Sequence, residues 1–420
     1  MKVKNLSVPL RSVAFAAACC AMASSAFAVD FDGYMRAGPG LTNAKGASRA
    51  CYDLRNTDGG HYRLGNECDF YGEFGLAQTA NVNGATYTAK VMFNEYSPGT
   101  DIGTSYTSFE QMYVEAKGLD VSPTTAFWAG KRFYGRENID MLDKFFVNMS
   151  GVGGGADLSM GGDTQLGLAL FTTDSGKGFG DSGTGASPNP GIRLNADLRG
   201  LPVNAGGKLR VTATYTDGRY DATATTPKGT SGVGLSLTHT QALPAIGGDN
   251  RLWLQYAQGS AGLDGNFGEM SAASSFKNYL LVDSVHFTSG ALEGVANIVL
   301  GKHDADLVAG AAAYKSMSIG GRIAYGITRN FKLNADIGFM QKKPDGGATQ
   351  NLTKFTIAPT LSIGKGLYDR PELRLYMTHA NWNAAAGAST GGTNGIRGSS
   401  FNDVTTTSGT SFGIQAEVWF

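Results

Sequence analysis

The sequence predicts an all-β protein, a transmembrane antiparallel β-barrel of about 18 strands. Three observations lead to this prediction. Apolar and polar residues alternate with a period of two along most of the chain. The alternating segments are about ten residues long, which matches the length of a tilted membrane-spanning strand. Beyond the amino-terminal leader, no apolar run approaches the ~20 residues that a spanning helix needs.

The composition agrees with such a barrel. The 420 residues include 60 Gly, 17 Tyr and 22 Phe, and 17% of the residues are charged. A chain that is polar on average but rich in aromatic residues is expected when a strand turns one face to lipid and the other to water. Acidic and basic residues number 35 each. No excess of basic charge points to a nucleic acid, and no strong net charge points to an ion-selective pore.

The first 28 residues are expected to be a signal peptide. Lys2, Lys4 and Arg11 form its basic start, an apolar stretch follows, and Ala26-Phe27-Ala28 forms the cleavage site. The mature barrel then comprises residues 29–420, with a net charge of about −3 because the leader removes three basic residues and no acid. Cys19 and Cys20 leave a lipid anchor as the alternative reading.

The last segment shows the alternation most clearly. One face carries apolar side chains and the other carries Gln415, Glu417 and Trp419. The apolar residues are Phe412, Ile414, Ala416, Val418 and Phe420. A soluble sandwich also alternates, but seventeen or eighteen long strand candidates are too many for one sandwich, and strands in lipid must close into a barrel. No domain boundary is visible. Irregular polar stretches at 45–60, 133–163, 172–190, 259–277 and 384–407 are expected to be the long external loops.

The same alternation predicts which side chains face the interior. In the first strand Tyr34 and Arg36 are inward, and in the second Tyr71 and Glu73 are inward. Near the end of the chain the inward set is Arg374, Tyr376, Thr378, Trp419 and, if its strand runs without a bulge, Trp382. Aromatic rings therefore share the wet face with charged groups.

This combination suits a sugar. An aromatic plane stacks on the C–H face of a sugar ring, while Arg, Asp and Glu exchange hydrogen bonds with its hydroxyl rim. Oligosaccharide is therefore the expected substrate. The alternative is that the same rings belong to the aromatic girdles at the membrane interfaces.

Four blocks of the chain resemble the maltoporin family. They are Val29-Asp30-Phe31 with Gly33-Tyr34 and Arg36; Tyr62-Arg63-Leu64-Gly65-Asn66-Glu67-Cys68 with Tyr71 and Glu73; Trp128-Ala129-Gly130-Lys131-Arg132-Phe133-Tyr134 with Arg136; and Glu417-Val418-Trp419. The resemblance implies an 18-stranded barrel, a homotrimer in the Gram-negative outer membrane, and passive uptake of maltose and maltodextrins. It also implies a constricting loop folded into the pore, from residue 133 to about residue 155.

Carried over residue by residue, the resemblance implies an aromatic slide and a polar track. The slide would contain Tyr34, Tyr71, Trp382 and Trp419, and the track would contain Arg36, Arg63, Glu73, Arg136 and Asp143. The family's loop disulfide maps onto Cys51 and Cys68, which an oxidising compartment would in any case be expected to pair. A metal site at these two cysteines is the alternative.

Several positions depart from the family pattern. Glu110 stands where the track has an Arg, Asn138 and Asp140 replace the loop's Asp and His, and Phe145 replaces a loop Tyr. No Trp occurs around residues 102–106, where a neighbouring subunit would contribute one to the slide, although Tyr106 could substitute. A further Phe of the family's slide corresponds to a position near Asp249 in this chain, and Trp253 is close by. Sucrose, a β-glucoside or a general non-selective pore therefore remain alternatives.

An enzyme is not expected. Gly180-Asp181-Ser182-Gly183 matches a short serine-protease sequence, but it stands in a Gly- and Ser-rich stretch. The five histidines show no metal-ligand spacing, and no cofactor motif is present.

Overall fold

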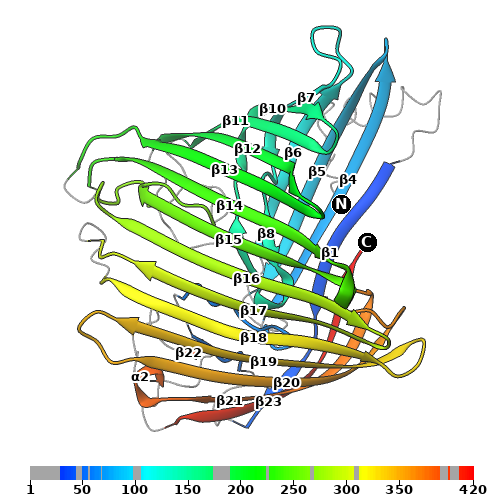
Figure 1. Ribbon diagram of the computed structural model, residues 1–420, viewed down its shortest axis with the longest axis vertical. Helices are drawn as coiled ribbons and strands as arrows, with labels where there is room; N and C mark the ends of the chain where they lie inside the picture. The colour runs from blue at the N-terminus through cyan, green and yellow to red at the C-terminus, as the bar shows by residue number, and fades with distance from the viewer. Residues whose placement is uncertain are drawn as a thin grey trace, which may run out of the picture.

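The computed structural model describes residues 29–43, 50–54, 57–67, 69–97, 106–173, 190–223, 227–264, 269–306, 312–387, 396–397 and 406–420. The leader, residues 1–28, therefore lies outside the described residues. The described residues form one closed antiparallel barrel of 18 strands (Figure 1). This confirms the predicted fold. No helix in the described ranges is long and apolar enough to span a membrane.

Every strand of the barrel pairs with the next one along the chain. The barrel strands are β1 (Val29–Ala37), β4 (Phe70–Val82), β5 (Ala85–Ser97), β6 (Tyr106–Lys117), β7 (Thr125–Arg132), β10 (Gly151–Gly161), β11 (Thr164–Thr173), β12 (Gly191–Asn204), β13 (Gly207–Gly218), β14 (Ser231–Leu243), β15 (Gly248–Gly259), β16 (Lys277–Ser289), β17 (Leu292–His303), β18 (Tyr314–Gly326), β19 (Phe331–Pro344), β20 (Gln350–Ser362), β21 (Glu372–Trp382) and β23 (Ser408–Trp419). Most of the connections at one end of the barrel are short turns, and most of those at the other end are longer.

The barrel closes where its first and last strands meet. β1 pairs with β23 so that Tyr34 lies opposite Trp419, and β1 pairs on its other side with β4. The short strand β2 (Gly40–Thr42) continues this seam along β23. Backbone hydrogen bonds from Gly33 to Phe420 and back, at 2.9 and 3.1 Å, complete it. Such closure leaves no strand edge unpaired, which a sheet in hydrocarbon requires.

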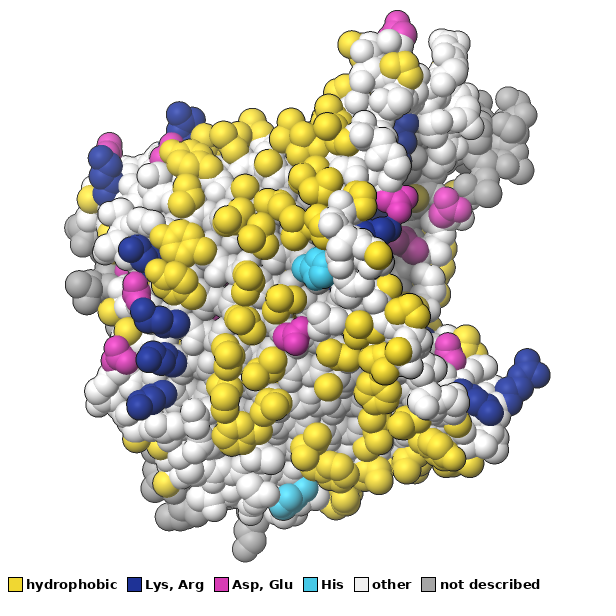
Figure 2. Space-filling view, in the orientation of Figure 1, with side chains coloured by type: hydrophobic (Ala, Val, Ile, Leu, Met, Phe, Trp, Pro, Cys, Tyr) yellow, Lys and Arg dark blue, Asp and Glu magenta, His cyan; other side chains and the backbone are white. Residues whose placement is uncertain are grey.

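The two faces of the barrel differ as the alternation predicts. On β21, Leu373 and Leu375 are each 56% exposed, whereas Arg374 between them is 1% exposed. Outward apolar side chains of this kind form a broad band over the visible surface (Figure 2). The polar side chains point into the barrel, where they pack against one another and against inward-folded segments. The barrel therefore has a lipid-facing exterior and a polar interior.

The sequence predicts a loop over residues 133–163, but the second part of this range is a strand. Residues 151–161 form β10, which completes the barrel wall between β7 and β11. Glycines at 151, 153, 154 and 155 hide the alternation of this strand in the sequence. Gly151 and Gly155 leave room for aromatic rings, because a Cβ on Gly151 would lie 2.9 Å from the Phe171 ring and one on Gly155 would lie 3.0 Å from the Trp128 ring. The inward loop therefore comprises residues 133–150.

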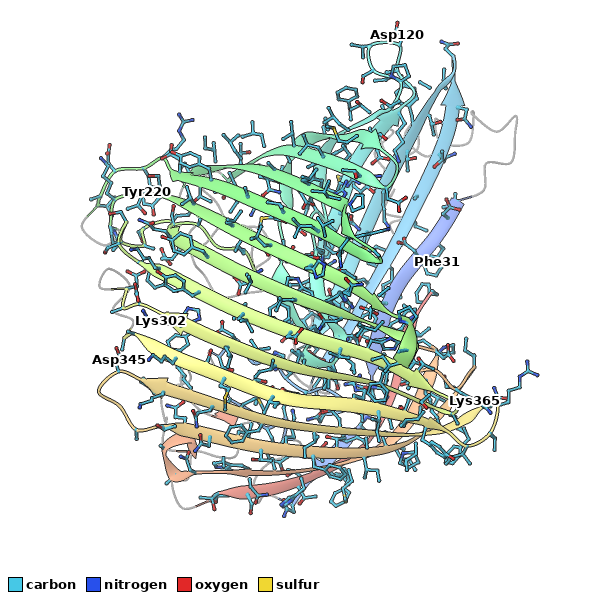
Figure 3. The ribbon with its side chains drawn as sticks, viewed as in Figure 1. Phe31, Asp120, Tyr220, Lys302, Asp345 and Lys365 are labelled. Carbon is cyan, nitrogen blue, oxygen red and sulfur yellow. The ribbon has the colours of Figure 1, made fainter. Side chains whose placement is uncertain are left out.

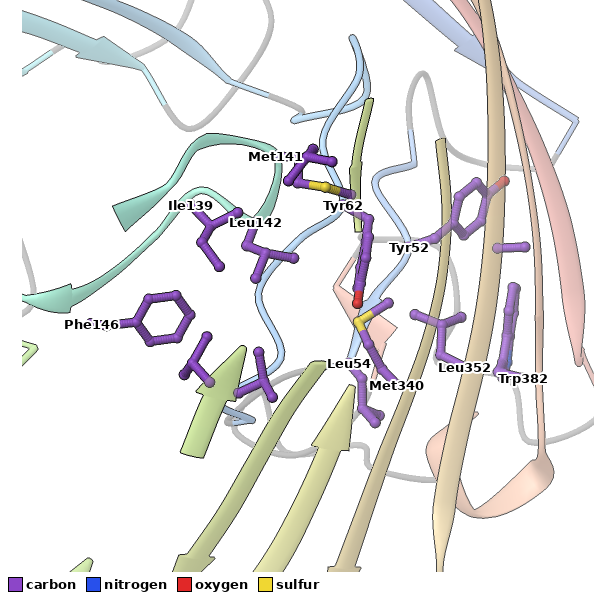
Figure 4. Packing of buried hydrophobic residues seen from close by; sticks show 14 of the residues in the cluster. Tyr52, Leu54, Tyr62, Ile139, Met141, Leu142, Phe146, Met340, Leu352 and Trp382 are labelled. Carbon is purple, nitrogen blue, oxygen red and sulfur yellow. The ribbon is translucent and has the colours of Figure 1, made fainter. Parts of the chain in front are cut away.

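Two segments fold into the barrel and meet there (Figure 4). One is the loop 133–150, which contains β8 (Glu137–Ile139), the 3₁₀ turn η1 (Asp140–Leu142) and β9 (Lys144–Val147). The other comprises residues 50–54 and 57–67, called here the inner segment, which contains β3 (Asp53–Leu54). Backbone amides of His61 and Arg63 donate to the carbonyls of Leu142 and Met141 at 2.7 and 2.8 Å. The short strand β22 (Ile396–Arg397) pairs with β3, and Ala386 of the helix α2 (Ala384–Gly387) belongs to the same buried cluster as Tyr52 and Leu54.

Candidate functional site

Four aromatic rings follow one another along the inner wall beside the seam. Trp419 on β23 stacks on Tyr34 of β1 with 6.5 Å between ring centroids and 22° between planes. Tyr34 lies 6.1 Å from Tyr71 on β4, and Tyr71 lies 6.4 Å from Tyr96 on β5. The register explains this row, because Tyr34 pairs with Trp419 and Tyr71 pairs with Tyr96 on neighbouring strands. The predicted inward residues Tyr34, Tyr71 and Trp419 thus form one continuous aromatic path.

A cluster of charges lies beside this path, between β1 and the two inward segments. Arg36 holds Asp69 with two hydrogen bonds of 2.8 and 2.7 Å and reaches Asp143 at 3.0 Å. Arg63 donates to the Tyr34 hydroxyl at 2.9 Å and lies 3.3 Å from Asp143. The carbonyl and carboxylate of Asp140 accept from the same guanidinium. Each guanidinium group thus binds two carboxylates, and Asp143 is the carboxylate that the two share.

The electrostatics of this cluster keep its groups charged. Burial by itself would raise the pKa of the Asp143 carboxyl, but the charges of Arg63 and Arg36 outweigh burial and hold that pKa well below its usual range. Burial by itself would lower the pKa of the Arg63 guanidinium, but the charges of Asp140 and Asp143 outweigh burial and hold that pKa well above its usual value. A carboxylate between two guanidinium groups stays ionised across the physiological range. The cluster therefore presents permanent hydrogen-bond donors and acceptors beside the aromatic path.

Arg136, on the inward loop, is clamped between two phenylalanine rings. Its guanidinium carbon lies 3.9 Å from the centroid of Phe133 and 4.1 Å from that of Phe145. The rings cover both faces of the guanidinium and leave only its edges for hydrogen bonds. Burial lowers the pKa of this guanidinium, although the nearby Glu73 and Tyr71 act against that shift. Among the described residues its Nε finds no hydrogen-bond partner.

A buried network of charges supports the Trp419 end of the path. The Arg370 guanidinium lies 4.5 Å from the Trp419 ring centroid and donates from Nε to Glu417 at 2.8 Å. Arg370 and Arg374 both bind Glu372 and Glu417. The Tyr34 hydroxyl donates to the other oxygen of Glu417 at 2.8 Å. Because every member holds two partners or more, the positions of Trp419 and Tyr34 are coupled.

Trp382 and Trp253 lie apart from the aromatic path. Trp382 points inward as the alternation predicts, because β21 pairs with β20 without a register shift. It is only 5% exposed and packs 5.7 Å from Tyr52 of the inner segment (Figure 4). Trp253 is fully buried against Phe146 of the inward loop at 5.8 Å. Both indoles thus contact the inward-folded segments.

Some expected features fall wholly or partly outside the described residues. Cys51 is disulfide-bonded, whereas Cys68, its expected partner, lies outside the described residues. The side chain of Tyr106 and the Gly180-Asp181-Ser182-Gly183 sequence also lie outside them.

Sequence reasoning missed several members of this site. Tyr96 could have been found, because Lys90, Met92, Asn94 and Tyr96 alternate with outward residues along β5. Asp69 and Arg370 follow no such pattern, since Asp69 precedes β4 and Arg370 stands in the turn before β21. Their contacts with Arg36 and Trp419 depend on packing between distant parts of the chain.

The fold and this site together define a class of protein. A closed barrel with an apolar exterior, a polar lumen and an inward-folded loop is an outer-membrane porin. The model of the LamB porin family matches residues 29–420, and the chain belongs to that family. The resemblance to the maltoporin family is thereby confirmed, as is the location in the outer membrane of a Gram-negative bacterium.

Solved structures show the same fold at low sequence identity. OccAB1 of Acinetobacter baumannii is 9% identical, with a TM-score of 0.52 over 93% of this chain and 96% of its own. OccK2 (OpdF) of Pseudomonas aeruginosa, solved in complex with glucuronate, is 9% identical, with a TM-score of 0.52 over 94% of this chain and 99% of its own. The fold and family together indicate a channel rather than an enzyme.

Proposed function

We propose that this channel is sugar-selective and carries oligosaccharides of the maltose and maltodextrin type by passive diffusion. One observation carries the proposal: the rings of Trp419, Tyr34, Tyr71 and Tyr96 follow one another at 6.1 to 6.5 Å beside fixed guanidinium and carboxylate groups. Each ring offers a stacking surface for the C–H face of a sugar, and the neighbouring charges take up its hydroxyl groups.

The spacing of the rings suits transport rather than tight capture. A sugar unit that leaves one ring reaches the next before its stacking contact is wholly lost, so no step requires full rehydration. Conduction needs sites that are favourable enough to enter and weak enough to leave, and a series of similar contacts meets both conditions. The aromatic path thus acts as the predicted slide, with Tyr34, Tyr71 and Trp419 as its members and Tyr96 as an addition.

The polar track accompanies the slide. Arg36, Arg63 and Asp143 form its centre, and Glu73 accepts a hydrogen bond from the Tyr71 hydroxyl. Arg136 adds donors whose direction is fixed by Phe133 and Phe145, so that only the guanidinium edge reaches the substrate. Trp382 joins the slide in this proposal only when Tyr52 moves aside, because Tyr52 packs against it.

The proposed sugar follows from the family, but the chain differs from the family pattern at several positions that bear on this choice. Glu110, Asn138, Asp140 and Phe145 change the hydrogen-bonding groups around the constriction relative to the family pattern. Asp140 is already bound to Arg63. Sucrose or a β-glucoside is therefore the second candidate substrate class, and it requires the same aromatic path.

The test is single-channel conductance in a planar bilayer with maltotriose, sucrose and cellobiose titrated in turn. Saturable block of the ion current by one sugar is expected, and that sugar names the substrate class. Tyr71→Ala and Trp419→Ala are each expected to weaken sugar affinity by roughly tenfold, on the order of one lost stacking contact, with little change in ion conductance. Tyr215→Ala is the matched control, because that ring lies on the outer face and is 41% exposed.

Two outcomes would count against the proposal. Large steady currents that no sugar blocks would identify a general porin instead. Unchanged sugar affinity in both ring variants would remove the aromatic path as the binding element even if the channel selects sugars.

The assembly and processing of the chain complete the proposal. The functional unit is a homotrimer embedded in outer-membrane lipid, as the family resemblance implies, and the chain is cleaved after Ala28. Light scattering of the purified protein in detergent measures the assembly, with three times the chain mass expected. Mass spectrometry of the exported protein measures processing, with Val29 expected as its first residue.

A further inference from the structure

Five outward-facing side chains form one row across neighbouring strands at the long-loop end of the barrel. The cross-strand register pairs Tyr256 with Tyr279, Tyr279 with Lys302, Lys302 with Lys315, and Lys315 with Lys343. All three lysines are exposed. Basic side chains stand one below another along the left edge of the visible surface, and Lys302 lies at the same end of the barrel as Tyr220, opposite Lys365 (Figures 2 and 3).

The row lies at the boundary of the apolar belt. Lys315 and the outward Tyr325 are ten residues apart on β18, or roughly 34 Å along the strand. A tilt of about 40° reduces this to roughly 26 Å along the membrane normal, close to the ~25 Å height of an apolar belt. Between them the outward residues include Met317, Ile319 and Ile323. The lysines therefore lie at headgroup level, on the side of the long loops, which face the cell exterior in such barrels.

Two of the three lysines have no acidic partner within the described part of the chain. Lys302 reaches Asp304 at 3.5 Å, but Lys315 and Lys343 make no ion pair within the described part of the chain. Like charges directly opposite each other on adjacent strands destabilise a sheet, because their Cβ atoms are only ~5 Å apart. Three such lysines in register therefore form a site of concentrated positive charge, which an anion with several oxygen atoms would relieve.

We propose that this row binds the phosphate groups of an anionic lipid in the outer leaflet. The phosphates bridge Lys302, Lys315 and Lys343, while the acyl chains lie on the belt below, where Leu300 and Ile319 are 39% and 50% exposed. Tyr279 borders the lysines at the same level, and amphipathic rings of this kind prefer the headgroup region. The continuity of the lysines with the apolar belt favours a lipid over a free phosphate or a protein partner.

The experiment uses the purified full-length protein in detergent micelles and measures lipid binding by native mass spectrometry. The probes are a lipid A carrying two phosphates, the same lipid without phosphates, and inorganic pyrophosphate. The triple variant Lys302→Gln, Lys315→Gln, Lys343→Gln is compared with Lys117→Gln, Lys208→Gln, Lys365→Gln, which removes the same charge at the short-turn end. Replacement of all three row lysines by Arg tests whether charge at this position suffices. Heat-dependent gel mobility checks that each variant is folded.

Binding of the phosphorylated lipid is expected to weaken by roughly 100-fold in the row-to-Gln variant, since each of the three lysines near an anionic headgroup contributes about a fivefold factor. The arginine variant and the control variant should bind as the parent does. The proposal is overturned if the lipid without phosphates binds as tightly, if both Gln variants weaken equally, or if pyrophosphate alone binds the row as tightly as the lipid.

Discussion

At the scale of single residues, the interior works through side chains whose orientation is fixed by several partners. Arg36, Arg63 and Asp143 each contact at least two charged groups of the cluster. Asp143 has a backbone φ of +48°, in the left-handed region that non-glycine residues seldom adopt, and its carboxylate meets both guanidinium groups there. The ion pairs accompany this uncommon conformation, which places Asp143 on the side of the inward loop that faces β1.

The Asp143 pairs should be visible in the pH dependence of loop stability. The pKa of the folded Asp143 carboxyl lies below the unfolded value of about 3.9. Its contribution is therefore complete above about pH 4 and is lost as the pH falls from there toward the folded pKa. Asp143→Asn should lower the free energy of opening of residues 133–150 by about 1–2 kcal/mol at pH 7, and hydrogen exchange of these residues should become faster.

The difference between the parent and Asp143→Asn should shrink as the pH is lowered from 5 toward 2. Asp120→Asn, in an exposed turn, serves as the control and should leave loop exchange unchanged. A difference that stays constant over this range would show that ionisation of Asp143 does not stabilise the loop.

At the scale of elements, a pair of glycines on the barrel wall leaves room for a side chain of the inner segment to pack against the strands. Gly320 and Gly338 lie opposite each other on β18 and β19. A Cβ on either would come within 2.4 Å of the ring of Tyr62, which is fully buried above them. Gly320→Ala should therefore displace Tyr62 and raise protease sensitivity of the inner segment, with a destabilisation of about 1–3 kcal/mol.

Gly321→Ala is the matched control, because Gly321 is the next residue on β18 and its side faces outward, away from Tyr62. The nearest side-chain atom to a Cβ there is 3.7 Å away, although the Val295 carbonyl is close at 2.7 Å. Equal protease sensitivity in the two variants would mean that a change in the backbone of β18, and not the packing of Tyr62 against the glycines, determines the effect.

The inward loop has its own anchor on strand β12. Arg193 of β12 is fully buried and donates to the carbonyls of Met149 and Ser150 at 2.6 and 3.3 Å, at the end of the loop. Arg193→Met should loosen the loop and increase both the size and the noise of the single-channel current. Arg199→Met removes an inward arginine on the same strand that pairs with Asp157 and Asp197 in the wall. A similar change of current in both variants would point to lost charge instead of lost anchoring.

The sequence carries the strand pattern and the inward faces, but not the contacts between distant segments. Alternation alone places Tyr34, Arg36, Tyr71, Glu73 and Trp419 inward, because a period of two assigns faces wherever the strand is regular. Strand β10 cannot be predicted from alternation, because glycines leave room there for the rings of Trp128 and Phe171, and a glycine has no side chain that could mark one face as polar or apolar. The partners of the polar track depend on the barrel seam and the inward folds, where residues as far apart as Tyr34 and Glu417 meet.

At the scale of the whole molecule, the barrel depends on the seam between its first and last strands. Phe420 lies on the outer face there, with its ring 4.8 Å from Phe31 and 6.4 Å from Phe74. Its ring therefore joins β23 to β1 and β4, in addition to the backbone hydrogen bonds with Gly33. In hydrocarbon such ring packing stabilises through close contact rather than through release of water.

Phe420→Ala should weaken the closure of the barrel without changing its hydrogen-bonding pattern. A loss of two aromatic contacts corresponds to about 1–3 kcal/mol, so the refolded protein should unfold at a lower temperature, measured by heat-dependent gel mobility. Phe412→Ala is the control, because Phe412 lies on the outer face of β23, which Phe420 directly follows, and the two side chains are similarly exposed, 46% and 44%. If the seam limits barrel stability, only Phe420→Ala lowers the transition; equal shifts in both variants would mean that lipid-facing rings contribute uniformly and that the seam has no special role.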